Sequence, residues 1–177
     1  MSFVDHLIHE LSHTPFANSK QLMLTLHCLF PNDFLPALDI LDRKLVRMVR
    51  VGTRTEDIFL VTSTSPPSRK SASSHQQDKS YEVRLRAWNC SCPTFALSAY
   101  RDQPPVTDDQ PSTTEGEHVN YPFGGTLTRD TTRSLSPVCK HILACILHAR
   151  CPDLFGGDSM FVVSMEELAG WCAGWGG

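Results

Sequence analysis

The 177-residue sequence lacks the features that mark membrane and secreted proteins. Its longest uninterrupted apolar run, residues 142–147, is far shorter than the ~20 residues that a membrane-spanning helix needs. Its first residues contain no basic stretch followed by an apolar one, so we expect no secretory signal. Both absences favour a soluble protein of a reducing, intracellular compartment.

The chain also lacks an excess of positive charge, because its formal net charge at pH 7 is -3. This excludes a globally basic nucleic-acid binder but leaves room for a local basic face. A Walker A glycine loop and a GxSxG motif are both absent from the sequence. We therefore expect a protein that is not an enzyme and that has no small-molecule substrate.

What is present predicts an α+β fold with N-terminal helices. The apolar residues of segment 3–11 share one helical face, and residues 36–43 form a short helix. Between them, Asn18 is positioned to cap a helix that runs to about Phe30. The predicted buried side of that helix consists of Leu22, Leu26, Leu29 and Phe30.

Strand patterns predict a small antiparallel sheet of about three strands. Residues 45–51 and 57–62 are rich in β-branched and bulky side chains, and a turn is expected between them. Residues 81–88 alternate between apolar and charged side chains, except that Trp88 falls on the charged face. Further helices are expected at residues 94–100 and 138–150, and Ser164 with Glu167 forms a capping box ahead of one more.

Two long polar inserts, residues 65–80 and 101–137, interrupt these elements and are expected to be flexible. The predicted organisation has three parts. Residues 1–43 form an N-terminal helical segment, and residues 44–150 contain the sheet and the metal-binding residues. Residues 151–177 form a C-terminal tail with a short helix.

Seven cysteines in an intracellular chain are more typical of metal ligands or buried thiols than of disulfides. Cys90 and Cys92 follow the alternating strand, whereas Cys139 and His141 stand at the start of a helix. Three thiolates and one imidazole complete the tetrahedral shell of a structural zinc site and leave no position for a substrate water. We predict one structural Zn²⁺ that ties the strand to the helix across the second insert.

Other interpretations of these residues remain. The four could be buried thiols with a surface histidine, and three neighbours, Cys145, His148 and Cys151, compete for a ligand position. The competitors fit core or surface positions better than ligand positions. Cys28 lies among apolar helix residues and Cys172 lies near the glycine-rich end, where a core residue and a free thiol are the simpler interpretations.

Cys90, Ser91, Cys92 and Pro93, followed by Cys139, Lys140 and His141, resemble the SWIM zinc finger, in which a CxC pair and a CxH pair flank a variable gap. Residues 38–43, Leu-Asp-Ile-Leu-Asp-Arg, resemble a segment found in the SWIM-domain subunits of Shu complexes. The likeness covers most of the chain outside the inserts. It departs from the family in the 46 residues that separate Cys92 from Cys139 and in the insert before Tyr81.

This resemblance implies a non-catalytic, nuclear subunit of a Shu-like complex. Such a subunit binds a RecA-like recombinase paralogue, in a heterodimer or a larger complex, and promotes recombinase filament assembly on single-stranded DNA. It would act in homologous recombination and DNA repair, with a zinc-dependent contact to the paralogue. The alternative is a SWIM finger that binds nucleic acid directly or serves as an adaptor in another assembly, such as a ubiquitin ligase.

Two sets of residues are candidates for these contacts. Those for DNA are the cations Arg43, Lys44, Arg47, Arg50, Arg54, Arg84 and Arg86, with Trp88 as a stacking side chain. Those for a protein partner are Phe3, Leu7, Leu11, Trp171 and Trp175. The simpler interpretations are a solvated strand face for the first set and, for the helix residues of the second, closure of the protein's own core.

Overall fold

The computed structural model describes residues 2–51, 57–63, 79–100, 121–125, 136–156 and 160–172. The fold is α+β, as the sequence predicts. Three helices come first, α1 (Phe3–His13), α2 (Lys20–Leu29) and α3 (Phe34–Asp42), with the 3-10 turn η1 (Phe16–Asn18) before α2. None of the described helices has the length and apolar character needed to span a membrane.

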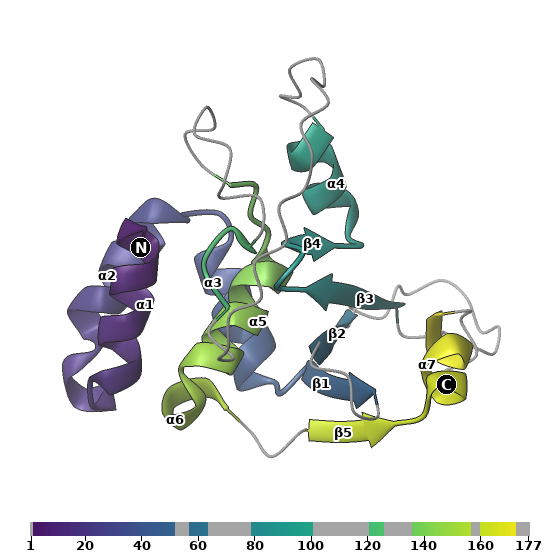
Figure 1. The fold of residues 1–177 in the computed structure, drawn as a ribbon. Coiled ribbons are helices and arrows are strands. Elements are labelled where there is room, and N and C mark those ends of the chain that lie inside the picture. The colour runs from purple at the N-terminus through teal and green to yellow at the C-terminus, as the bar shows by residue number, and fades with distance from the viewer. Residues whose placement is uncertain are drawn as a thin grey trace, which may run out of the picture.

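The described sheet has five strands rather than about three, in the order β4-β3-β2-β1-β5 (Figure 1). The strands are β1 (Val46–Val51), β2 (Asp57–Ser63), β3 (Lys79–Arg84), β4 (Asn89–Cys90) and β5 (Met160–Val163). The first four pair in antiparallel fashion, whereas β5 runs parallel to β1. Strand β5 was not predicted from the sequence, because its short apolar run has no alternation.

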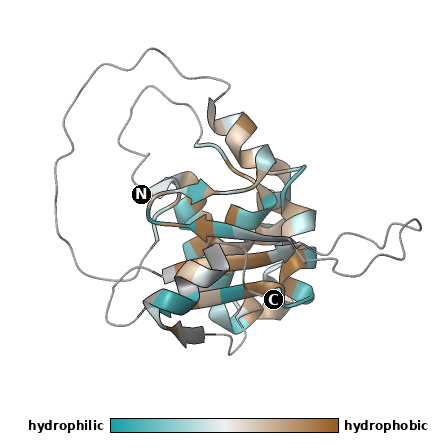
Figure 2. Ribbon diagram, turned by 90° about the vertical axis from the view of Figure 1, so that its right-hand side faces the viewer, coloured by the Kyte–Doolittle hydropathy of each residue, from teal (hydrophilic) through white to brown (hydrophobic). Residues whose placement is uncertain are grey.

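The remaining helices are α4 (Pro93–Tyr100), α5 (Lys140–Arg150), α6 (Pro152–Phe155) and α7 (Met165–Cys172). Helix α5 is the centre of the core, because every residue from His141 to Leu147 is buried. It packs against α3 on one side and against the sheet on the other (Figure 1). Figure 2 shows hydrophobic residues concentrated in the strands and in the helices that face them.

Sheet alternation separates two apolar faces. Val46, Phe59 and Val83 join the main hydrophobic cluster with α1, α3 and α5. Val49, Ile58 and Val163 point to the opposite face and form a smaller cluster. The capping box predicted at the start of α7 is confirmed, since the Glu167 backbone N–H donates to Ser164 Oγ and the Ser164 N–H donates to the Glu167 carboxylate.

Several local predictions were wrong. Helix α2 is preceded by Ser19 rather than Asn18, which ends η1. Leu29, predicted on the buried side of this helix, is exposed. The strand predicted for residues 81–88 ends at Arg84 and is followed by a turn, in which Trp88 has a left-handed backbone with φ of 48°. That turn directs the Trp88 side chain inward and rules out a continuous alternating strand.

The second insert is not polar throughout. Tyr121 and Phe123, within the stretch predicted to be flexible, are both buried in the main cluster. Gly125 has φ of 54°, and a Cβ placed there would lie 2.6 Å from the Arg86 carbonyl oxygen, so the segment packs tightly against the turn after β3. Most of both inserts (64–78, 101–120 and 126–135) and the turn at 52–56 lie outside the described residues.

Candidate metal centre

Strand β4 and the start of α5 bring the four predicted ligands together. Cys90 ends β4 opposite Val83 of β3, and Cys92 follows immediately before α4. Cys139 is the residue that precedes the first turn of α5, and His141 lies within that turn. Ser91, between the two cysteines, fixes the CxC segment to β3: its N–H donates to the Glu82 carbonyl, and its Oγ accepts from the Glu82 N–H.

The ligand atoms of Cys90, Cys92, Cys139 and His141 all lie within 4.8 Å of one another, and all four residues are buried. Cys90 Sγ is 3.8 Å from His141 Nδ1. In a tetrahedral zinc site with Zn–S bonds of ~2.3 Å, two ligand atoms are about 3.6 to 3.8 Å apart. The cluster therefore has the donor set and the spacing to hold a metal ion.

The electrostatics of the three thiols show why a cation fits here. Hydrogen bonds from Cys139 and Cys90, supported by His141 and the Phe95 N–H, lower the pKa of Cys92. Hydrogen bonds with Cys139 and Cys92, together with burial, raise the pKa of Cys90. Without a cation, one thiolate therefore forms readily and makes ionisation of its neighbour unfavourable. A divalent ion removes this conflict because it stabilises every thiolate that coordinates it.

Cys139 illustrates the same competition. Its hydrogen bond with Cys90 lowers its pKa, but the hydrogen bond with Cys92 and burial outweigh this effect and raise the pKa to about 12. The thiol stays protonated near neutral pH unless a cation replaces its proton. Metal binding at this cluster would thus release protons.

Side chains and backbone N–H groups around the cluster contact the ligands and their neighbours. The Tyr81 ring stacks on the His141 imidazole with centroids 4.6 Å apart. The Phe95 N–H donates to Cys92 Sγ at 3.3 Å. Asp33 accepts a hydrogen bond from the Lys140 backbone N–H beside the cluster, although burial raises the pKa of this carboxyl. Sequence reasoning did not identify Asp33 as a neighbour of the site. Ser91 was visible as the residue between the two cysteines, and Tyr81 as the first residue of the alternating pattern.

Trp88 is buried next to the segment that leads to Cys139 and is not a surface residue. Its side chain is 1% exposed, and its indole Nε1–H donates to the Pro137 carbonyl at 2.8 Å. It also meets the Phe123 ring edge-on with centroids 4.7 Å apart. The prediction that Trp88 stacks on nucleic-acid bases is therefore wrong, because the ring is enclosed between the segment before Cys139 and residues 121–125.

The other DNA-contact candidates differ in exposure and in their partners. Arg47 and Arg86 are exposed, Arg50 is half-buried, and Arg54 lies outside the described residues. Arg43 is exposed and pairs with Asp39, and Lys44 is exposed with a left-handed backbone. Arg84 pairs with Glu82 on its own strand. Direct binding of nucleic acid remains a prediction.

The partner candidates separate into different environments. Phe3 is 62% exposed, whereas Leu7 and Leu11 are buried in the main core, so for these two leucines the prediction of a surface role is wrong. Both lie on the buried side of α1. Trp171 belongs to α7, and Trp175 lies outside the described residues.

The rival ligands are not members of the cluster. Among the described residues, no other group of three or more histidine, cysteine or acidic side chains converges in this way. Cys145 is fully buried, which raises its pKa, and the Cys151 thiol faces the Ile8 carbonyl. His148 Nδ1 contacts the Phe155 carbonyl. Cys28 is exposed rather than a core residue.

The fold and the site together define an α+β protein with a buried Cys₃His cluster suited to a metal ion. Comparisons of the sequence with models of known families and with curated proteins gave no match. The likeness to SWIM fingers therefore depends on the CxC and CxH residues and on residues 38–43.

Proposed function

We propose that the chain is a non-catalytic subunit of a Shu-like complex, in which a structural zinc ion keeps the binding domain folded. One observation carries the proposal: Cys90, Cys92, Cys139 and His141 form a closed, buried four-ligand cluster. Zinc fits this donor set best, because thiolates and imidazole in tetrahedral arrangement are its usual structural ligands. With four protein ligands, no position remains for an activated water.

The segment that resembles Shu-complex SWIM subunits lies next to this centre. Residues 38–43 lie almost entirely in α3, which packs against α5, the helix that begins with the CxH ligands. Ile40 and Leu41 are buried in the core, and Asp39 is exposed. The two parts of the resemblance are therefore neighbours in the fold, which supports a single SWIM-like unit rather than two chance matches.

Zinc content is the first test. We expect about one zinc per chain in protein purified without added metal. The Cys90→Ser/Cys92→Ser double variant should lose the zinc, whereas Cys28→Ser, which changes an exposed cysteine outside the cluster, should retain it. A folded wild-type protein without zinc would refute the metal centre.

Partner binding is the second test and can fail independently of the first. We expect co-expression with RecA-like recombinase paralogues to give a stable complex with the wild type and with Cys28→Ser, but not with the double variant. Zinc-loaded protein that binds no such paralogue would refute the recombination role while the zinc site stood. Binding to single-stranded DNA alone, with a steep loss of affinity as salt rises, would instead favour a direct nucleic-acid module.

A further inference from the structure

The outer face of α1 carries an unusual group of side chains. His6, His9, Glu10 and His13 are all exposed and recur at spacings of three and four residues, so they share one side of the helix. Neither the core nor the Cys₃His cluster involves them. His9, Glu10 and His13 match the HExxH pattern, in which two histidines four residues apart on one helix face bind a metal ion.

His9 and His13 are already paired. Their ring centroids are 4.4 Å apart, with an angle of 55° between the ring planes. Two nitrogens bound to one ion at ~2.0–2.1 Å lie about 3 Å apart. Two histidine rings this close, one turn apart on a helix, can each supply one nitrogen to the same ion once their side chains rotate.

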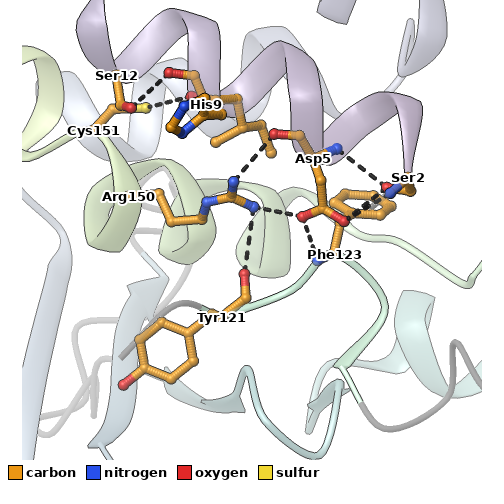
Figure 3. Close-up of polar contacts among 9 residues, drawn as sticks. Ser2, Asp5, His9, Ser12, Tyr121, Phe123, Arg150 and Cys151 are labelled. Atoms are coloured by element: carbon orange, nitrogen blue, oxygen red, sulfur yellow. Dashed lines mark hydrogen bonds and ion pairs between the residues drawn. The ribbon is translucent and has the colours of Figure 1, made fainter. Parts of the chain in front are cut away.

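Hydrogen bonds fix which nitrogen of His13 is available. Its Nδ1 lies 2.9 Å from the His9 carbonyl oxygen and 3.0 Å from Ser12 Oγ. The Ser12 hydroxyl itself donates to the same His9 carbonyl, at 2.7 Å (Figure 3). Because a carbonyl only accepts hydrogen bonds, this contact favours the neutral tautomer with the proton on Nδ1 and the lone pair on Nε2. Metal-binding histidines typically use the same arrangement, with one ring N–H donated to a carbonyl and the other nitrogen on the metal.

We propose that His9 and His13 form a second metal site, which takes a divalent transition-metal ion such as Zn²⁺ or Ni²⁺. Ions of this group prefer imidazole nitrogen ligands. His13 binds through Nε2, His9 supplies the second nitrogen, and water fills the remaining positions. With two protein ligands on an exposed helix, the site is weaker than the buried Cys₃His cluster and exchanges its ion with solvent.

Calorimetric titration of the zinc-loaded full chain with Ni²⁺, near neutral pH, tests the site. We expect one equivalent of Ni²⁺ to bind to the wild type and to be lost in His9→Ala and in His13→Ala. The matched control is His6→Ala, which removes an exposed histidine from the same face but keeps the pair, and which should retain the equivalent. Binding should also weaken on acidification, because protons compete for the same lone pairs.

The alternatives are distinguishable. All three substitutions are at exposed positions, so unchanged thermal unfolding would establish that each variant is folded. No binding by the wild type would overturn the proposal. Equal binding by the wild type and by His13→Ala would also overturn it, because the ion would then be adventitious or bound elsewhere.

Discussion

The two ends of α5 are joined to the rest of the protein by different chemistry. At its N-terminal end, Cys139 and His141 meet Cys90 and Cys92 in a cluster of three thiols and one imidazole, which contains no group of opposite charge. At its C-terminal end, Arg150 forms a buried ion pair with Asp5 of α1, with Nη1 and Oδ1 2.6 Å apart (Figure 3). The same helix thus has a cluster that could hold a metal ion at one end and an ion pair made by the protein alone at the other.

The charges and hydrogen-bonding groups of the Asp5–Arg150 ion pair have partners within the protein. Arg150 also donates to the Asp5 and Tyr121 carbonyls, and Asp5 accepts from the Phe123 backbone N–H and from Ser2. Each side chain is less than 10% exposed. Because the opposite charges neutralise each other and the polar atoms have partners, this end needs no further component.

The difference has a practical consequence. If the Cys₃His end of α5, the metal end, binds an ion, its contribution to stability should vary with the concentration of free metal, since an ion that binds only the folded state stabilises it by mass action. The stability supplied by the ion pair varies with pH. Two ends of one helix should therefore respond to two different solution conditions.

The largest expected effect comes from removing the metal ion from the Cys₃His cluster. Structural zinc contributes on the order of 10 kcal/mol of apparent folding free energy. We therefore expect a strong chelator, Cys139→Ser or His141→Ala to lower the thermal unfolding temperature steeply or to prevent folding, and to abolish partner binding. Calorimetry with and without chelator measures this. The Cys90→Ser/Cys92→Ser variant should not respond to the chelator, and an unchanged unfolding temperature after stoichiometric loss of zinc would contradict a structural role.

A smaller effect is expected from breaking the protein-only end. Arg150→Ala leaves the Asp5 carboxylate buried without its partner, which typically costs about 3–5 kcal/mol. Urea unfolding of the zinc-loaded protein measures this loss. The double variant Asp5→Asn/Arg150→Met removes both charges and should be less destabilised than Arg150→Ala. A double variant as unstable as the single one would mean that packing, rather than charge, dominates at this end.

The ion pair also predicts a response to acid. Burial alone would raise the pKa of Asp5, but hydrogen bonds from the Phe123 N–H, Arg150 and Ser2 lower it below its ordinary value. The carboxylate therefore stabilises the fold above the unfolded pKa of about 3.9, and this contribution is lost as the pH falls toward the folded value. The stability difference between wild type and Asp5→Asn, from urea unfolding at several pH values, should shrink on acidification. Metal loss affects both proteins equally, and a constant difference would contradict the assignment.

The sequence predicted the metal end far better than the ion pair, for a physical reason. Ligand chemistry restricts zinc to a few residue types, so Cys90, Cys92, Cys139 and His141 are recognisable before their positions in space are known. An aspartate near the N-terminus and an arginine 145 residues later carry no such mark. Only the fold makes them partners.

The periodicity of apolar residues predicted the helices well, but it failed where a turn interrupted a strand pattern or where polar neighbours surrounded core residues. Helix α1 has one buried side and α5 is buried on all sides along residues 141–147, and both were placed to within a few residues. The alternating pattern placed Trp88 on the charged face of the predicted strand. The left-handed turn at this residue instead directs its side chain into the core. Tyr121 and Phe123 were hidden by polar neighbours, although two aromatic residues two positions apart were a signal that this part of the insert could reach the core.

The smallest expected effect concerns the direct hydrogen bond at the metal end, from Trp88 Nε1–H to the Pro137 carbonyl. In zinc-loaded Trp88→Phe, the carbonyl loses its donor while most of the ring contact with Phe123 is kept, so the expected cost is about 2 kcal/mol. Urea unfolding measures it, and single-stranded DNA binding should be unaffected because the ring is buried. The cost should stay below that of Arg150→Ala. A larger loss would mean that protein-only contacts, rather than the ion, hold the N-terminal end of α5, and the contrast between the two ends would no longer stand.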